Sequence, residues 1–188
     1  MIGLDELEEK KMYDLALKIA TEAHEGQTRK FGEDKGKPYI IHPIRVASNL
    51  KGKAKQAGVT HDTIEDTNLT KAKLIEKGIH EDVAEAVDIL SKKKGDNYFS
   101  FIMRIVQGSG TDDGLPNTIP FQIALIVKIE DIKDNSKDLK EGSMKDKYRL
   151  ALYILENHLS DLYNMGLIEG DWVKGDRWNY GTEKSVWM

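Results

Sequence analysis

Four side chains that could bind a metal or transfer a proton lie within six residues, in the stretch HDTIED at residues 61–66. On a helix, residues four apart share a face, which would stack His61 over Glu65 and Asp62 over Asp66. Two carboxylate pairs and an imidazole so close together repel one another, so a cation is expected to offset their charge. A divalent metal is the natural candidate. The alternative is an acidic helix end that is simply solvated, and the motif alone leaves both open.

Two other positions could complete such a site. His42 lies in the segment PYIIHP, where Pro43 suits the first turn of a helix. Asp131 interrupts an apolar helical stretch, and Asn135 follows one turn later on the same face. A buried carboxylate must be paired or bound to a metal, so Asp131 requires a partner unless it is exposed at a helix end.

The composition limits the kind of site and the kind of partner. The chain has 188 residues, enough for one compact domain with a substantial core. Lys and Arg total 28 against 32 Asp and Glu, for a net charge of -4, which argues against a general nucleic-acid-binding surface. There is no cysteine, which excludes disulfides, thiolate metal sites and cysteine nucleophiles. Any metal must be held by nitrogen and oxygen.

The sequence also favours a cytoplasmic location. The first residues lack the basic flank and apolar stretch of a secretory signal. The strongest apolar run, residues 123–127, is too short to span a bilayer. We therefore expect a soluble cytoplasmic protein that has no membrane partner.

Hydrophobic periodicity predicts an all-α fold in which a series of helices positions these residues. The third expected helix would carry the central motif, and Ser143 with Asp146 resembles a capping box at the start of the last one. In the short fourth helix, Leu74 and Ile75 are expected to face inward. The expected helices run over Leu4 to about Ala23, Pro43 to a stop at Gly52, Ala54 to about Asp66, Thr70 to Lys77, about Glu81 to Ser91, Tyr98 to Gln107, Phe121 through Ile132, and Ser143 to Leu162.

Three segments are expected to be irregular. A basic loop, residues 27–37, leads into the segment that carries His42. Residues 108–118, rich in Gly, Asp, Pro and Asn, are predicted to be a flexible insertion. The last segment, residues 164–188, contains tryptophans that we expect to pack this tail on the domain, or to form an oligomer contact, rather than to bind a ligand. These are Trp172, Trp178 and Trp187.

Five short blocks occur in the order AHEGQTRK, PYIIHP, HDTIEDT, VKIEDIKDN and KYRLAL. This order resembles the HD-superfamily hydrolase domain of the RelA/SpoT-type alarmone enzymes, especially its stand-alone forms, the small alarmone hydrolases. The resemblance extends from about Leu15 to Leu155. PYIIHP or HD alone is a weak signal, but five blocks in order are specific. The resemblance implies a compact HD-type helical bundle at residues 1–163, followed by the Trp-containing tail.

The resemblance also implies a role for individual residues. Glu65 and Asp66 would orient and activate the attacking water. The implied ligands of one divalent metal, typically manganese in this family, are His42, His61, Asp62 and Asp131. The implied substrate contacts are Arg29, Lys30, Lys92, Asn135 and Tyr148.

The chain departs from the family pattern in a few places. Thr60 precedes the HD pair where relatives usually have an apolar residue. The loop between Arg29 and Pro38 is several residues longer than in typical relatives. Ile132 stands where the bifunctional enzymes often have arginine. The four implied metal ligands are all present.

The activity that the resemblance implies is metal-dependent removal of pyrophosphate from the 3′ position of guanosine tetra- or pentaphosphate, (p)ppGpp, which yields GDP or GTP. Two imidazoles and two carboxylates suit Mn²⁺ and leave open positions on it, without excluding Fe²⁺ or Zn²⁺. No synthetase domain would fit in the chain, so hydrolysis alone is expected. The expected partner is a small nucleotide, with oligomerisation left open.

One alternative is an HD phosphohydrolase acting on another nucleotide, such as the 2′-phosphate of NADPH. Another is a non-catalytic alarmone binder or antitoxin-like protein.

Overall fold

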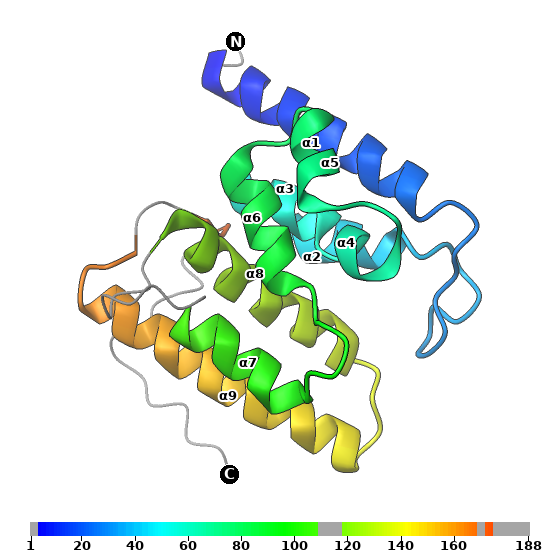
Figure 1. Ribbon diagram of the computed structural model, residues 1–188. Helices are drawn as coiled ribbons and strands as arrows, with labels where there is room; N and C mark the ends of the chain where they lie inside the picture. Colours follow the sequence, from blue (N-terminus) through cyan, green and yellow to red (C-terminus); the bar gives the residue numbers. More distant parts are fainter. Residues whose placement is uncertain (1–3, 109–117, 169–171, 175–188) are drawn as a thin grey trace.

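Helix α8 runs through the middle of the fold, and the other helices are arranged around it (Figure 1). The structure, a computed structural model, describes residues 4–108, 118–168 and 172–174. The whole run Phe121–Val127 is buried and apolar except for Gln122, so this part of α8 must be covered from all directions. The helices are α1 (Leu4–Ala23), α2 (Ile41–Ser48), α3 (Gly52–Thr60), α4 (Thr63–Asp66), α5 (Lys71–Glu76), α6 (Glu81–Leu90), α7 (Tyr98–Gln107), α8 (Ile119–Ser136) and α9 (Ser143–Asn164).

Two groups of helices cover α8. On one side, α2, α3 and α6 pack against it, with α1 lying across α3 and α5 against α6. On the other side, α7 and α9 lie next to each other (Figure 1). Among the described residues the β-structure is limited to two isolated bridges, Thr28 with Pro38 and Leu50 with Val173. The all-α prediction is confirmed, and the bounds predicted for α1 and α7 are those observed.

The single helix predicted from Ala54 to Asp66 is wrong. Helix α3 ends at Thr60, α4 begins at Thr63, and the HD pair forms the turn between them. The reason is local, because side chains near the turn donate hydrogen bonds to three backbone carbonyls at the end of α3. The Thr60 hydroxyl donates to Gln56 O at 2.8 Å, His61 Nδ1 to Gly58 O at 2.8 Å, and the Thr63 hydroxyl to Thr60 O at 2.7 Å.

Smaller corrections concern glycines and one apolar side chain. Gly52, predicted to end the preceding helix, instead begins α3 with φ of +50°. Helix α9 does begin at Ser143, but Gly142 holds the cap position and no side chain caps the helix. Ile75, expected to face inward, is 37% exposed, whereas Leu74 is fully buried as expected.

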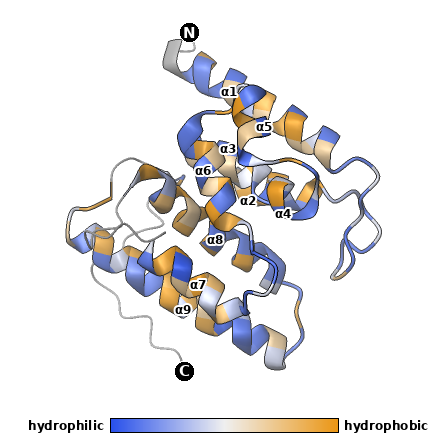
Figure 2. Ribbon diagram, in the orientation of Figure 1, coloured by the Kyte–Doolittle hydropathy of each residue, from blue (hydrophilic) through white to orange (hydrophobic). Residues whose placement is uncertain are grey.

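The basic loop before α2 is held by its own backbone. Arg29 N–H donates to Lys37 O, and Gly36 N–H donates to Arg29 O, both at 2.9 Å. Tyr39 N–H donates to Gln27 O at 2.9 Å, so the two ends of the loop run antiparallel. The loop projects from the bundle and is mostly hydrophilic (Figure 2). It is therefore a hairpin-like arm that begins and ends next to the HD turn.

Part of the tail packs on the domain, as expected for its first tryptophan. Trp172 is partly buried, and its Nε1–H donates to Gln122 Oε1 at 3.4 Å. Its carbonyl accepts from Lys51 N–H at 2.9 Å. Trp178, Trp187 and residues 109–117 of the predicted insertion lie outside the described residues. In the described part of the chain, no helix is both long enough and apolar enough for a membrane span.

The α2–α3 contact generates a stability prediction at Gly58. A Cβ at this position would lie 2.9 Å from Leu50 Cδ1 and 3.2 Å from the backbone Cα of Ala47. Helix propensity alone would favour alanine by about 1 kcal/mol, but the backbone of α2 cannot move away easily. We expect Gly58→Ala to destabilise the protein by about 1–3 kcal/mol, which lowers Tm by about 2–4 °C per kcal/mol in a chain of this length.

Thermal unfolding followed by circular dichroism measures this effect. The control is Glu76→Ala, a substitution to alanine at an exposed position of α5. A Tm for Gly58→Ala equal to or above that of the unsubstituted protein would show that α2 and α3 are not packed this closely.

Candidate metal centre

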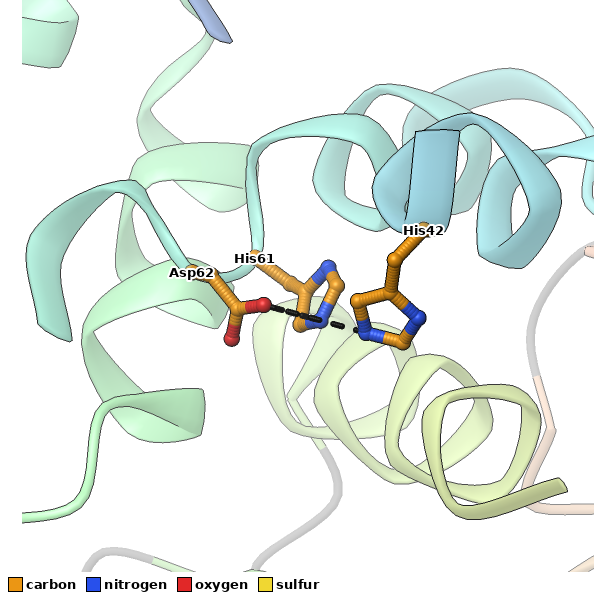
Figure 3. Close-up of side chains that lie close together, drawn as sticks. All are labelled: His42, His61 and Asp62. Carbon is orange, nitrogen blue, oxygen red and sulfur yellow. Dashed lines mark ion pairs between the residues drawn. The ribbon is translucent and has the colours of Figure 1, made fainter. Parts of the chain in front are cut away.

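Three segments that are distant in sequence bring two imidazoles and two carboxylates together. His42 projects from α2, and His61 and Asp62 project from the turn between α3 and α4 (Figure 3). One ligand atom from each of these three lies within 4.8 Å of the others. Asp131, from the buried part of α8, places Oδ1 3.1 Å from His42 Nε2 and 3.5 Å from His61 Nε2. The structure thus brings together all four residues predicted as metal ligands.

The environment of His61 fits a cation. Its ring is 3% exposed, and its Nδ1–H donates to Gly58 O at 2.8 Å, which directs Nε2 toward the cluster. Nε2 is buried and has no hydrogen-bond partner among the described residues, although Asp62 Oδ2 lies 3.0 Å away. A buried polar atom without a hydrogen bond is costly. The donor set of two nitrogens and two carboxylates suits Mn²⁺, Fe²⁺ or Zn²⁺, so the residues fit a divalent metal.

The cluster attracts positive charge strongly. Burial alone would lower the pKa of His61, but the carboxylates of Asp62 and Asp131 outweigh burial and raise it to about 10. Burial would raise the pKa of Asp131, yet Lys128 and the two histidines bring it well below its usual range. Burial would likewise raise the pKa of Asp62, but the charge and hydrogen bond of His61 and the charge of His42 together lower it. Both carboxylates are therefore ionised at neutral pH.

Two residues that were not predicted donate hydrogen bonds to these carboxylates, Tyr39 to the Asp62 oxygen that faces the histidines and Lys128 to the Asp131 oxygen that faces away from them. The Tyr39 hydroxyl donates to Asp62 Oδ2 at 2.5 Å. Lys128 Nζ donates to Asp131 Oδ2 at 2.7 Å and lies over the ring of Phe101. Both residues belong to blocks of the sequence that were recognised, PYIIHP and VKIEDIKDN. Their positions, three residues before His42 and before Asp131, were the available signal.

His42 has a second set of partners that the sequence analysis also missed. Its Nδ1 lies 2.7 Å from Asp134 Oδ2, and Arg45 bonds both oxygens of the same carboxylate. Asp134 and Arg45 each lie three residues after a predicted ligand on the same helix, so helical spacing could have indicated them.

The two predicted catalytic carboxylates lie beside the cluster on α4. Glu65 and Asp66 line an open cavity of about 540 Å³ together with Gln27 and Lys73. Glu65 Oε2 accepts from the backbone N–H of Lys92 at 2.7 Å. Loss of surrounding water raises the pKa of Glu65, and the charge of Asp62 adds to this rise. A carboxylate with a raised pKa beside a metal site is suited to accept a proton.

The predicted substrate residues fall into two groups. Arg29 and Asn135 are already joined, since Arg29 Nη2 donates to Asn135 Oδ1 at 2.9 Å and Asn135 Nδ2 donates to Asp131 Oδ1 at 2.6 Å. Lys30 is exposed, and its charge partly offsets the rise in pKa that desolvation and Asp62 cause at Asp66.

The other group lies further from the metal ligands. Lys92 contacts the site through its backbone, by the bond to Glu65. Tyr148 is on α9, with its ring 5.9 Å from that of Tyr98 and Lys147 Nζ 5.0 Å from its centre. Burial raises the pKa of Tyr148, and the charge of Asp131 adds to the rise. These residues border the site without contacting the cluster directly.

Comparisons with known proteins agree with this geometry. The chain is 41% identical over 93 residues to a guanosine-3′,5′-bis(diphosphate) 3′-pyrophosphohydrolase of Borreliella burgdorferi, covering 47% of the chain and 13% of the relative. It is 30% identical over 165 residues to the protein of the same name from Vibrio cholerae, covering 79% of the chain and 21% of the relative. The chain therefore spans about a fifth or less of the length of these relatives. No family model matches the chain.

A solved structure shares the fold. It is a metazoan ortholog of SpoT, described as hydrolysing ppGpp, which superposes with a TM-score of 0.57 at 16% identity. The match covers 84% of this chain and 97% of that one. The shared fold is an all-α domain that carries the His–Asp cluster. By sequence, most of the chain is similar to part of the RelA/SpoT-type hydrolases named above.

The cluster generates a prediction about metal binding. Mn²⁺ should raise Tm, because a ligand that binds only the folded state adds about 2.7 kcal/mol when its concentration is roughly 100 times Kd. Asp131→Asn should abolish most of this increment, since the amide cannot replace the carboxylate as a charged ligand. Thermal unfolding with Mn²⁺ and with chelator measures the difference.

A matched control is Asp138→Asn, which removes an exposed carboxylate just beyond α8. This variant should keep the full Mn²⁺ increment. Equal increments in both variants would show that Asp131 does not contribute to metal binding.

Proposed function

We propose that this chain is a metal-dependent (p)ppGpp 3′-pyrophosphohydrolase, which releases pyrophosphate and leaves GDP or GTP. The observation that carries the proposal is the meeting of His42, His61, Asp62 and Asp131 around the buried His61 Nε2, which has no hydrogen bond to any residue that the structure describes. The names of the relatives from Borreliella burgdorferi and Vibrio cholerae supply the substrate class.

The four clustered residues would hold the metal, which we propose to be Mn²⁺. Its hard, oxygen-containing ligand set favours that ion over softer alternatives. When bound, such a cation acts as a Lewis acid that lowers the pKa of water and polarises a phosphoryl oxygen. The contribution of the protein is to keep both carboxylates ionised and both imidazole Nε2 atoms facing the cluster.

Glu65 is the proposed general base. Its Oε2 is oriented by the Lys92 backbone N–H, which leaves Oε1 to accept a proton from the attacking water. Desolvation raises the pKa of Glu65, which makes the carboxylate a better proton acceptor. Asp66, the next residue on α4, would orient the same water from the wall of the cavity.

Cationic side chains around the cluster would neutralise the phosphates of the substrate. Arg29 and Lys30 approach from the basic loop, and Lys128 approaches from α8. A guanidinium can bond two phosphate oxygens at once, which suits Arg29 to a diphosphate group. Asn135 would offer an amide to the nucleotide, and Tyr148 an aromatic face. In this proposal the partner is a small anionic nucleotide.

The test is hydrolysis of a nucleotide panel by the purified protein with Mn²⁺. We expect pyrophosphate to be released from guanosine tetraphosphate, and that release to stop when chelator is added. Orthophosphate released from the 2′-phosphate of NADPH, without release of pyrophosphate from guanosine tetraphosphate, would favour the alternative phosphohydrolase. Tight binding of guanosine tetraphosphate without turnover in either assay would favour a non-catalytic alarmone binder.

The proposed base generates a separate prediction. Glu65→Gln should lower kcat by about 10²–10⁴-fold, because the amide cannot accept the proton. KM and the Kd for Mn²⁺ should change little, since Glu65 is not among the four proposed ligands. Steady-state kinetics and metal titration measure the three quantities.

Glu76→Gln serves as the control for this prediction, because it changes an exposed carboxylate on α5. A kcat for Glu65→Gln within a factor of a few of the unsubstituted value would assign the base elsewhere, with Asp66 as the next candidate.

A further inference from the structure

The ring of His42 is fixed from the side that faces away from the metal ligands. His42 is 1% exposed, and its Nδ1 lies 2.7 Å from Asp134 Oδ2. Nδ1–H therefore donates to this carboxylate, and the lone pair on Nε2 faces Asp131 and Asp62. In metal sites a ligating histidine usually donates its other N–H to a carboxylate or carbonyl, which sets both the tautomer and the orientation of the ring.

Asp134 is itself held tightly. Arg45 Nε donates to Asp134 Oδ1 at 2.7 Å, and Arg45 Nη2 donates to Oδ2 at 2.9 Å. This is a bidentate arginine–carboxylate pair, whose planar geometry allows little rotation of the carboxylate. The Asp134 side chain is 9% exposed, so solvent screens the pair only weakly. Lys137 Nζ also donates to Oδ1, at 2.9 Å, from the solvent side.

Arg45 extends this line of contacts to the basic loop. Its Nη1 lies 2.6 Å from Asp34 Oδ2, and Asp34 Oδ1 accepts from Lys37 Nζ at 2.8 Å. Asp34 is part of the loop that carries Arg29. One guanidinium thus bonds a carboxylate of the loop and the carboxylate that orients His42.

We propose that Asp134 is a positioning residue for His42, and that Arg45 joins it to Asp34 so that one set of ion pairs positions both the metal ligand and the substrate-binding loop. Asp134 does not contact substrate or metal in this scheme; it acts through the imidazole. The inference rests on the proposed metal site, but it does not depend on which nucleotide is hydrolysed.

The first test compares Asp134→Asn with Lys137→Ala. Asparagine keeps the shape of the side chain but removes its charge, which weakens both the acceptor for His42 and the pair with Arg45. We expect the Kd for Mn²⁺ to rise about 10–100-fold in Asp134→Asn. Lys137→Ala removes a donor to the same carboxylate and should leave Kd within about twofold, because at 39% side-chain exposure its pairing is screened.

Isothermal titration with Mn²⁺ gives Kd, and thermal unfolding without metal gives the effect on the fold. A residue with only a structural role would lower Tm and leave Kd unchanged, and that result overturns the proposal. If Asp134→Asn does not fold, Arg45→Lys takes its place. Lysine keeps the positive charge but loses the bidentate geometry, so Kd should still rise several-fold, and an unchanged Kd again overturns the proposal.

The second test addresses the connection to the loop, using Asp34→Asn. We expect faster hydrogen exchange at the amides of Arg29 and Gly36, which close the loop, with the Kd for Mn²⁺ unchanged. Unchanged exchange at these amides would overturn the role of Arg45 as the connection.

The outcomes separate this inference from the proposed function. If the unsubstituted protein binds Mn²⁺ tightly but does not hydrolyse guanosine tetraphosphate, the proposed function fails and the role of Asp134 is still decided by Kd. If hydrolysis occurs but Asp134→Asn binds Mn²⁺ normally, only this inference fails. If the unsubstituted protein binds no divalent metal, both fail.

Discussion

The ionised carboxylate of Asp131, placed on the buried part of the central helix α8, is the constraint on which the surrounding structure depends. An unpaired charge at 4% exposure would be costly, and the site compensates for it with donors from several directions. Lys128 and Asn135 donate from α8 itself, and His42 and His61 approach from α2 and from the HD turn. The same packing that buries α8 against α2 and α3 therefore also brings the ligands together. The contacts that form the core are the contacts that place the ligands.

Much of this could be predicted from sequence because its causes are local or periodic. The helices show apolar residues at helical spacing, and α1 and α7 were predicted with their observed bounds. The four ligands could be predicted as one set because each falls in a short recognisable block. Asp131 also stands out by itself, as a charge inside an apolar helix that has to be explained.

What could not be predicted was determined by individual hydrogen bonds, some of them local and some between segments far apart in the chain. The HD pair looked helical because nothing in its composition shows that Thr60, His61 and Thr63 would bond the carbonyls behind them. Thr60, directly before the HD pair, is one of these three residues. Helical spacing places Arg45 and Asp134 near His42 and Asp131, but only the packing of α2 on α8 makes the two residues partners.

Residues 172–174, which follow α9, contact the connection between α2 and α3 and form part of the packed domain. Asn49 O accepts from Lys174 N–H, and Lys51 N–H donates to Trp172 O, both at 2.9 Å, on either side of the fully buried Leu50. Val173, 4% exposed, belongs to the same core. The connection held by these two hydrogen bonds links α2, which carries His42, to α3, which precedes His61. Removing the chain beyond α9 would therefore expose Leu50 and the connection between α2 and α3.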